Sequence, residues 1–532
     1  MALVLRRLGR VEIARSYLRD IRNNNDYFHF TVGRTTAWTD DTSPETPIDS
    51  DDYIKTYRRS IMFSQLITSA DACLLAKRLN WDSTGNTVYD EYDDAISTSN
   101  KTNSGASTIA DSTMVVVTDE FKVYKCINNN SNAKSVNKPT STGTAVFSLD
   151  DGYQWKFMFQ ISSSDQTKFL DTDYIPVRKL TGNPTHDVTG EVDTITVDTA
   201  GAGYDSTPSV VISGDGTGAG ATATMAGSGG SQTVDSITVT TPGSGYSFAL
   251  ASFVGGTPST TAVATVNLGD ADSLPALQSA VESASTDGTV DRIKVTAAGV
   301  NYASGDVQVS ISGDGSGAEA TATVAGGAIT GVTVTTPGSG YTYADVTFTN
   351  TAASGTGATA RAIVSPQGGH GSNAPKELFA SNLGLVTSLS DNTNKDLILG
   401  NDYRQIALVK NLTNSSDTIY TTGTGSACYV INVSDTTNYA ADDIITTDDG
   451  GSFTVGQLDT DNNNIYLVAK IPLITASSTL TNSTKSLTGL SINSVTSPEI
   501  KNTSGEIVYL DNRTPITRSE DQVETLKAII RF

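Results

Sequence analysis

The chain has 532 residues, of which 57 are acidic and 35 are basic, and its net charge is −22. This length exceeds what one hydrophobic core usually serves and predicts about two to four domains. The negative charge opposes binding to phosphate backbones and to anionic membranes, and no apolar stretch approaches the ~20 residues that span a bilayer. We therefore expect neither nucleic acid nor a membrane among its partners.

The composition favours a mainly β fold. Charged residues make up only 17% of the chain and glycines number 47, with Thr, Ser and Asn abundant throughout, as in proteins rich in strands and turns. The cysteines Cys73, Cys126 and Cys428 are odd in number and far apart. They predict neither a disulfide framework nor a zinc site, and they fit synthesis in a reducing compartment.

The N-terminal part begins with a predicted amphipathic helix from Val11 to about Asn23, where apolar residues recur at three- and four-residue steps. The alternating, aromatic-rich segment Tyr27–Gly33 predicts a strand. From Asp51 to Leu79 an apolar stripe predicts a second helix, with a break near Thr68–Asp71.

Strands are predicted for most other segments outside the centre of the chain. Period-two patterns occur in Met114–Ile127, Tyr153–Ile161, Asp402–Asn411 and Asn464–Leu473. The chain ends in two further apolar strands after Ser504, joined by a polar link.

The central block, from about 192 to 366, contains an internal duplication. ISGDGTGAGATAT (Ile212–Thr224) recurs as ISGDGSGAEATAT (Ile311–Thr323), and ITVTTPGSGY (Ile237–Tyr246) recurs as VTVTTPGSGY (Val332–Tyr341). Because two long segments recur in the same order, the block holds two copies of one unit.

Each copy divides again, since Ile195–Tyr204 and Ile293–Tyr302 repeat the same order of strand, glycine turn and tyrosine. Four quarter-units result, and we expect them to form short β-meanders. The tyrosine of each unit should cover the end of a small core while its hydroxyl bonds a backbone group or water. The alternative is an aromatic, glycan-facing platform made by the same residues: Tyr204, Tyr246, Tyr302 and Tyr341.

The sequence contains few candidate catalytic or ligand-binding motifs. The histidines His29, His186 and His370 are dispersed, so neither a metal centre nor a nucleophile–base pair is indicated. The GDG segments lack the Lys and Ser or Thr of a P-loop. Asp215 and Asp314 in these segments are favoured as plain turn residues, because calcium takes about six to eight oxygens. We expect no enzyme activity, no cofactor and no metal.

Two tryptophans and three arginines are candidates for interface or core roles. Trp38 and Trp155 would suit a protein interface, although core packing is favoured for both. Arg34, Arg404 and Arg513 lie in or beside predicted strands. Each would form bidentate bonds to carboxylates across a subunit contact, or else be solvated or paired within the chain.

Four stretches, in order along the chain, resemble the baseplate wedge subunit of contractile-tailed phages, the gene product eight family of myoviruses. They are YFHFTVGRTTAW (Tyr27–Trp38), DDGYQWKFMFQI (Asp150–Ile161), DYRQIALVKN (Asp402–Asn411) and SGEIVYLDNRTPITRSEDQ (Ser504–Gln522). The repeat block has no counterpart in the shorter members and is similar to the form carried by some cyanobacterial phages. The interface or core-motif candidates within these stretches are Arg34, Trp38, Tyr153, Trp155, Arg404, Asn512 and Arg513.

The resemblance implies a layered β-sandwich core with a few peripheral helices, interrupted by an inserted domain of repeated short β-meanders. The implied core comprises residues 1–185, 367–411 and 504–532. The β-repeat domain would occupy 190–366, and a second, smaller β-rich insertion would occupy 412–503.

The resemblance also implies a structural, non-enzymatic role in the tail baseplate of the virion, after assembly in the host cytoplasm. The chain would link neighbouring wedge proteins and help transmit the rearrangement that accompanies sheath contraction. The implied partners are other wedge proteins and a second copy of the chain, forming a homodimer.

Two other interpretations stay open at this point. In one, the chain is a receptor- or glycan-binding tail protein that uses the Tyr-bearing repeats. In the other, it is a polysaccharide depolymerase built on β-repeats, which would require paired carboxylates in a groove.

Overall fold

The computed structural model describes residues 6–22, 26–180, 192–214, 216–244, 246, 249–268, 275–350, 354–389, 402–517 and 524–532. Strands account for 47% of the structure and helices for 10%, and many of the sheets are antiparallel. The expected mainly β fold is therefore confirmed. The helices are α1 (Arg7–Arg22), α2 (Asp51–Arg58), α3 (Ser163–Lys168), α4 (Pro275–Ser283) and α5 (Ala374–Glu377).

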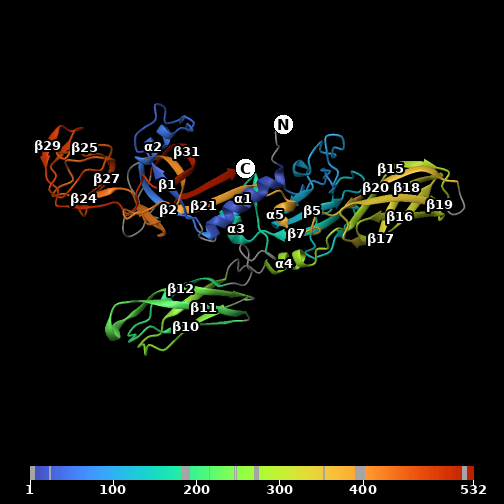
Figure 1. Cartoon of the computed structure of the whole chain (residues 1–532), viewed down its shortest axis with the longest axis horizontal. Coiled ribbons are helices and arrows are strands. Elements are labelled where there is room, and N and C mark those ends of the chain that lie inside the picture. The colour runs from blue at the N-terminus through green and yellow to red at the C-terminus, as the bar shows by residue number, and fades with distance from the viewer. Residues whose placement is uncertain are drawn as a thin grey trace. The chain divides into compact units, whose positions relative to one another are not determined.

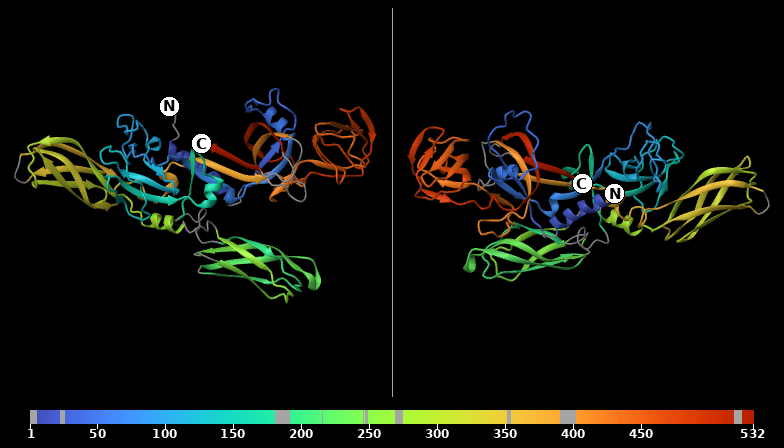
Figure 2. Two further views of the ribbon diagram at one scale, coloured as in Figure 1. Left: turned by 180° about the vertical axis from the view of Figure 1, so that it is seen from behind. Right: turned by 45° about the horizontal axis from the view of Figure 1, so that its top comes forward.

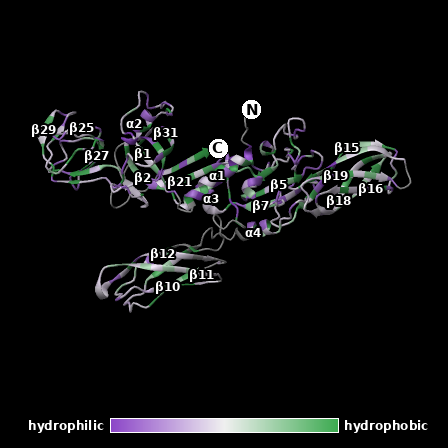
Figure 3. Cartoon of the chain, viewed as in Figure 1, coloured by the Kyte–Doolittle hydropathy of each residue, from purple (hydrophilic) through white to green (hydrophobic). Residues whose placement is uncertain are grey.

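The chain divides into two compact units, each assembled from segments that are far apart in the sequence (Figure 1). Unit 1 contains Met1–Ala14, Leu74–Asn382 and Phe532, and unit 2 contains Arg15–Cys73 and Leu383–Arg531. Hydrophobic residues gather on the strands, whereas α2 and the loops beside it are largely hydrophilic (Figure 3). The strands therefore supply most of the apolar surface that the cores bury.

Unit 2 is organised around a five-stranded antiparallel sheet in the order β23–β2–β1–β22–β31. Its strands are β1 (Phe28–Gly33), β2 (Ile61–Leu66), β22 (Asp402–Lys410), β23 (Thr424–Ser426) and β31 (Glu506–Thr517). Leu408 of β22 pairs with Phe30 on one side and with Tyr509 on the other. Strands predicted near both ends of the chain are therefore confirmed, and they are neighbours in one sheet.

The helix predicted from Asp51 to Leu79 is wrong beyond Arg58. Helix α2 starts where Ser50 accepts a hydrogen bond from the Tyr53 backbone N–H, and the rest of the segment forms β2 and β3 (Ala72–Lys77). A short 3-10 turn at Ser69–Asp71 joins them, at the expected break. Most residues of β2 and β3 are buried, so these strands are apolar runs that periodicity alone does not distinguish from a helical stripe.

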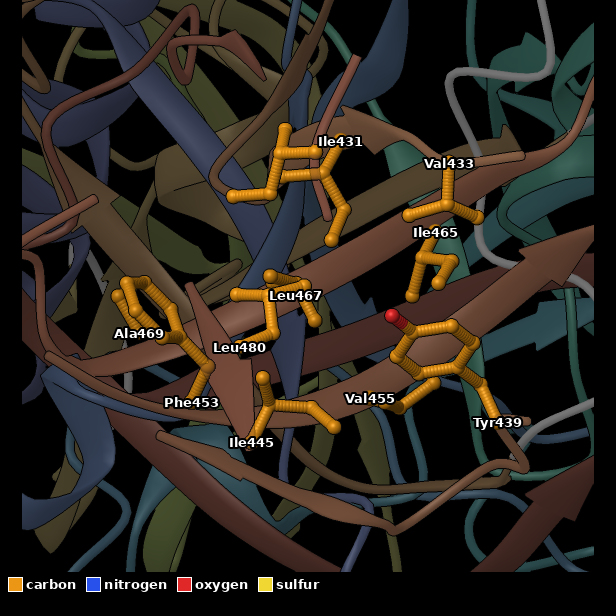
Figure 4. Close-up of a cluster of buried hydrophobic side chains, with 11 residues drawn as sticks. Ile431, Val433, Tyr439, Ile445, Phe453, Val455, Ile465, Leu467, Ala469 and Leu480 are labelled. Atoms are coloured by element: carbon orange, nitrogen blue, oxygen red, sulfur yellow. The ribbon is translucent and has the colours of Figure 1, made fainter. Parts of the chain in front are cut away.

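A second sheet of unit 2 has seven strands in the order β29–β28–β25–β26–β27–β24–β30. They are β24 (Tyr429–Asn432), β25 (Ile444–Thr447), β26 (Ser452–Asp459), β27 (Asn464–Ile471), β28 (Leu480–Asn482), β29 (Leu487–Leu490) and β30 (Ser494–Thr496). Figure 4 shows the apolar side chains that converge in its core, among them the fully buried Phe453, Ile465 and Leu467. The strand predicted within Asn464–Leu473 is confirmed as β27. Two further strands, β21 (Asn382–Leu389) and β32 (Glu524–Arg531), pair with each other.

Unit 1 contains a four-stranded sheet in the order β4–β5–β7–β6. Its strands are β4 (Val115–Val117), β5 (Lys122–Asn128), β6 (Phe147–Ser148) and β7 (Gln154–Gln160), and β8 (Tyr174–Val177) pairs with β3. The strands predicted around 114–127 and 153–161 are confirmed. Tyr124, Trp155 and Phe157 are fully buried in the core of this sheet, and α4 adds Val281 to it.

The duplicated block of unit 1 forms two modules of six strands each. In the second module (290–364) the strands close into a barrel in the order β15–β18–β17–β16–β19–β20, yellow in Figure 2. They are β15 (Val290–Val300), β16 (Val307–Gly313), β17 (Ser316–Ala325), β18 (Ala328–Ser339), β19 (Ala344–Asn350) and β20 (Thr356–Val364). One quarter-unit of this module supplies β15, β16 and β17, and the other supplies β18, β19 and β20. The two interleave, because β18 lies between β15 and β17.

The first module (192–268) has the same six strands in two sheets, β12–β11–β10–β13 and β14–β9. They are β9 (Val192–Thr199), β10 (Ser209–Gly214), β11 (Thr217–Ala226), β12 (Thr233–Ser244), β13 (Ala249–Val254) and β14 (Val263–Leu268). β9 and β14 pair Val192 with Leu268, so the first and last described residues of the module are neighbours.

Candidate interface site

Three of the four family-like stretches come together in the five-stranded sheet of unit 2. β1 belongs to the first stretch, β22 to the third and β31 to the fourth. Trp38 Nε1 donates a hydrogen bond to the backbone oxygen of Arg513 at 2.9 Å, joining positions 475 residues apart in sequence. The second stretch supplies β7 and lies in unit 1.

Arg404 holds the loop after β1 against β22. Its Nε and Nη2 donate to the two carboxylate oxygens of Asp41 at 3.0 and 2.9 Å, and its Nη1 donates to the Thr35 carbonyl at 2.6 Å. Nη2 also donates to Asp402 Oδ2 at 3.0 Å. The hydrogen bond from Arg404 lowers the pKa of Asp41, and the same bond raises the pKa of Arg404. A bidentate pair of this kind is strong and directional, and here both partners belong to one chain.

Arg34 and Trp38 pack on each other in the same loop. The guanidinium carbon of Arg34 lies 3.6 Å from the centre of the Trp38 ring, a cation–π contact. Arg34 has a positive φ of 60°, and its Nε donates to the Thr36 carbonyl at 3.1 Å. Trp38 is only 8% exposed, so its burial supports the core role over the interface role.

Asn512 and Arg513 follow each other on β31 but have different surroundings. The Asn512 side chain accepts a hydrogen bond from Gln405 Nε2 at 2.8 Å and donates to Tyr53 Oη at 2.6 Å. The Arg513 side chain is 50% exposed and its Nε lies 2.8 Å from Asp511 Oδ2. Asn512 therefore ties α2 to the sheet, whereas Arg513 keeps half of its surface open to solvent.

Tyr153 and Trp155 belong to the core of unit 1. Their rings stack with centroids 5.5 Å apart and an interplanar angle of 17°, and both residues are fully buried. The Tyr153 hydroxyl donates to the Ala133 carbonyl at 2.6 Å and accepts from the Tyr89 backbone N–H at 3.2 Å. Both aromatic residues are core residues of the sheet, as the favoured interpretation of Trp155 expects.

Unit 1 contains a buried charged network that no sequence pattern predicted. Lys125 Nζ lies 2.9 Å from Glu377 Oε2. His370 Nε2 lies 2.7 Å from Asp291 Oδ2, and its Nδ1 lies 3.8 Å from Glu377 Oε2. The signal in the sequence is Lys125 itself, because it shares the inward face of β5 with apolar residues.

This network is structural in character. Burial alone would raise the pKa of Glu377, but the Lys125 charge and the neighbouring His370 lower that pKa to about 2. Glu377 is therefore ionised and paired inside the protein. Each of the four side chains is less than about a tenth exposed, so the group holds β5, β15 and α5 together and has no open face for a substrate.

Two arginines fix the second module to the preceding segment of unit 1. Arg292 Nη1 lies 2.6 Å from Glu91 Oε2, and Arg361 reaches Asp93 and Asp94 at 2.6 and 2.7 Å. The aligned positions of the first module are threonines, at 194 and 265. The copies of the duplicated unit therefore differ in the residues that anchor them.

The four repeated tyrosines occupy equivalent, buried positions, with exposures between 0% and 7%. Each hydroxyl accepts a hydrogen bond from the backbone N–H of an alanine, as expected. The pairs are Tyr204 with Ala262 (2.8 Å), Tyr246 with Ala219 (3.4 Å), Tyr302 with Ala358 (3.3 Å) and Tyr341 with Ala318 (3.4 Å). A buried ring presents no face to a sugar, so the structure does not support the glycan-facing reading of Tyr204, Tyr246, Tyr302 and Tyr341.

The turn before each tyrosine depends on a glycine three residues earlier. Gly201, Gly243, Gly299 and Gly338 have φ between 63° and 69°, a conformation that glycine adopts at low steric cost. A Cβ at Gly338 would also lie 2.5 Å from the Ala318 nitrogen, the same group that binds the tyrosine. The repeated G-x-x-Y spacing thus encodes both the turn and its closure.

Of the remaining predicted positions, Asp314 lies in a turn of the second module. Asp314 accepts hydrogen bonds from the Thr342 backbone N–H at 2.8 Å and from its hydroxyl at 2.5 Å, as a turn residue does. Asp215 and His186 lie outside the described residues. Within the described ranges, no group of three or more His, Cys, Asp or Glu is placed to hold a metal ion.

In the part of the chain that the structure describes, no helix combines the length and apolar character required to cross a membrane. A scan against protein-family models finds no match for this chain, and neither does a search of curated proteins.

Proposed function

We propose that this chain is a non-enzymatic structural subunit of the baseplate wedge of a contractile phage tail. In this role it links neighbouring wedge proteins and helps transmit the rearrangement that accompanies sheath contraction. Its partners are other wedge proteins and a second copy of itself in a homodimer. It is assembled in the host cytoplasm and resides in the tail baseplate of the virion.

One observation carries the proposal. Three stretches that resemble the family, separated by hundreds of residues, supply the adjacent strands β1, β22 and β31. They are joined further by the Arg404–Asp41 pair and by the Trp38 hydrogen bond to Arg513. If the resemblance arose by chance, the matching stretches would not be expected to form neighbouring strands. Neighbouring strands are expected if the stretches belong to one structural body.

The physical character of this sheet suits a part that transmits displacement between its neighbours. Arg404 joins the sheet to the loop after β1 through directional, charge-assisted hydrogen bonds, and the interior is close-packed, so displacement at one edge is passed to the other. The receptor-binding alternative depends on exposed repeat tyrosines, and their rings are buried. We therefore retain the scaffold role.

Immunolabelling of purified virions tests the proposal. An antibody raised against the second module, which is anchored by Arg292 and Arg361, should label the end of the contractile tail. Antibody against a capsid protein serves as the control for particle integrity. Label confined to the capsid, or protein found in infected cells and absent from virions, would count decisively against a baseplate role.

A further inference from the structure

The first module exposes apolar side chains on the outer face of the β10–β13 pair. Val211 lies opposite Ser252 in this pair, with Leu250 and Val254 at the two diagonal positions. Side chains alternate along a strand, so all four residues share the outer face and are close enough for contact. Val211, Leu250 and Val254 are 44%, 65% and 58% exposed.

A fourth apolar residue extends this face onto β14. Val263 is 55% exposed, and β13 and β14 pack beside each other. The register that joins β19 to β20 in the second module, transferred to β13 and β14, places Val263 across from Ser252. We call Val211, Leu250, Val254 and Val263 the outer apolar face.

The second module provides an internal control for this face. The residues aligned with it are exposed and polar: Ser310, Asp345, Thr349 and Thr359. The same six-stranded fold therefore forms with polar groups at these positions, and the apolar residues are not required by the architecture. Adjacent exposed apolar residues are typical of a surface that contacts another protein.

The charge around the outer apolar face identifies the kind of partner. No Lys or Arg occurs between Lys179 and Arg292, while acidic residues recur throughout that segment. Asp198 accepts a hydrogen bond from Thr265 of β14 at 2.7 Å, and Asp205 accepts one from Thr257, just beyond β13. Both aspartates are exposed and flank the face. A second copy of this face would bring like charges together, whereas a basic surface would neutralise them.

We propose that the outer apolar face of the first module docks a basic protein surface, one whose Lys or Arg side chains surround an apolar centre. The apolar residues supply the desolvated centre of the contact, and the aspartates supply its orientation and salt dependence. This inference rests on the proposed function in placing the partner among neighbouring tail proteins.

Site-specific photo-crosslinking in lysates of infected cells tests this docking face. A photoreactive amino acid replaces Ser252, at the centre of the face, in the full-length chain. The matched control carries it at Thr347, the aligned position of the second module. After irradiation at low and high salt, mass spectrometry identifies the cross-linked peptide.

The Ser252 probe should capture another protein through a Lys- or Arg-bearing peptide, with a yield that falls as salt rises. Converting the face to the residues of the second module, Val211→Ser, Leu250→Asp, Val254→Thr and Val263→Thr, should lower the yield by about tenfold or more. The second module shows that these polar residues are compatible with the fold.

Three outcomes would overturn the inference: equal yields at Ser252 and Thr347, capture of a second copy of the chain, or capture of an acidic surface. Immunolabelling does not depend on this face. If immunolabelling places the chain in the tail but Ser252 gives no cross-link, only the docking face is refuted. If Ser252 cross-links to a basic protein that is not part of the tail, only the baseplate role is refuted.

Discussion

Buried charge is the residue-level feature that most strongly constrains unit 1. Lys125 and Glu377 are almost completely buried, and each is the counter-charge of the other. Removal of one partner from such a pair typically costs about 3–5 kcal/mol, because the remaining charge is left without compensation inside the protein. Loss of either charge should therefore destabilise unit 1, even though the intact pair adds little net stability.

Glu377 should make the stability of unit 1 sensitive to acid. Its pKa in the folded protein is about 2, below the ordinary value of 4.5, so the unfolded chain takes up a proton first as the pH falls. The stabilisation is fully present above about pH 4.5 and is lost as the pH falls through about 2. Over that window the free energy of unfolding should fall by roughly 3 kcal/mol.

The substitution Glu377→Gln should remove this acid dependence and lower the free energy of unfolding at neutral pH by about 3 kcal/mol. Urea unfolding between pH 7 and pH 2, followed by the tryptophan fluorescence to which the buried Trp155 contributes, measures both effects. Asp119→Asn is the matched control, because the Asp119 side chain is 77% exposed. If both variants show the same pH dependence as the parent chain, Glu377 does not have the role assigned to it.

In unit 2 the geometry of Arg404 should matter more than its charge. Arg404→Lys keeps the charge but loses the two-pronged contact with Asp41, so the free energy of unfolding should drop by roughly 2 kcal/mol. Arg513→Lys, at a half-exposed position, should change it by less than about 0.5 kcal/mol. Denaturant unfolding followed by tryptophan fluorescence compares the two variants. Equal changes in the free energy of unfolding would show that the two-pronged contact of Arg404 adds no stability beyond that of an exposed arginine.

At the scale of elements, the glycine before each repeated tyrosine is the most restrictive position of a quarter-unit. Gly338→Ala places a Cβ 2.5 Å from the Ala318 nitrogen at a φ of +63°, which should destabilise the barrel by about 2 kcal/mol or more. Gly331→Ala has nothing within 4 Å of its Cβ and serves as the control. Hydrogen exchange of the Ala318 amide should accelerate in the first variant only; protection unchanged in both would contradict the turn's assigned role.

The elements that the sequence predicts correctly carry their signal locally. β1, β7, β22 and β27 combine β-branched and aromatic residues in short runs. The G-x-x-Y turn has the same local sequence pattern in all four quarter-units. The segment 61–77 was predicted wrongly because β2 and β3 are buried on nearly all sides, so they lack the alternation that marks a half-buried strand.

Sequence patterns predict some of the residues that belong to the candidate site, but not the contacts that these residues make. Sequence patterns selected Arg34, Trp38 and Arg404, and the structure brings them together. The partner Asp41 and the buried Lys125–Glu377 pair depend on contacts between residues hundreds of positions apart, such as the 252 positions between Lys125 and Glu377. No local pattern encodes such pairings, except that a lysine on the inward face of an apolar strand indicates that some buried partner exists.

At the scale of the whole molecule, removal of the first module and removal of the second should have different effects on the stability of the remaining chain. Deleting residues 192–268 and joining the ends with a short Gly-Ser linker should change the unfolding free energy of the remainder by less than about 0.5 kcal/mol. The reason is that Val192 and Leu268 are paired neighbours, so the module enters and leaves at one place.

The matched deletion of 290–364 should destabilise the remaining chain. It removes Asp291, Arg292 and Arg361, which pair with groups of unit 1 outside the module. Chemical unfolding of both deletions, followed by circular dichroism and by Trp155 fluorescence, tests the contrast. Two deletions with the same effect would contradict the difference in anchoring.

The central claim is that the sheet built from both ends of the chain is a rigid part of a baseplate. A cryo-electron microscopy reconstruction of intact tails, before and after sheath contraction, tests it most directly. We expect density for the sheet β23–β2–β1–β22–β31 at the tail end in both states, with its strand order unchanged while its contacts to neighbouring proteins shift. Density for the chain elsewhere in the virion, or a sheet whose strands re-pair on contraction, would contradict the account.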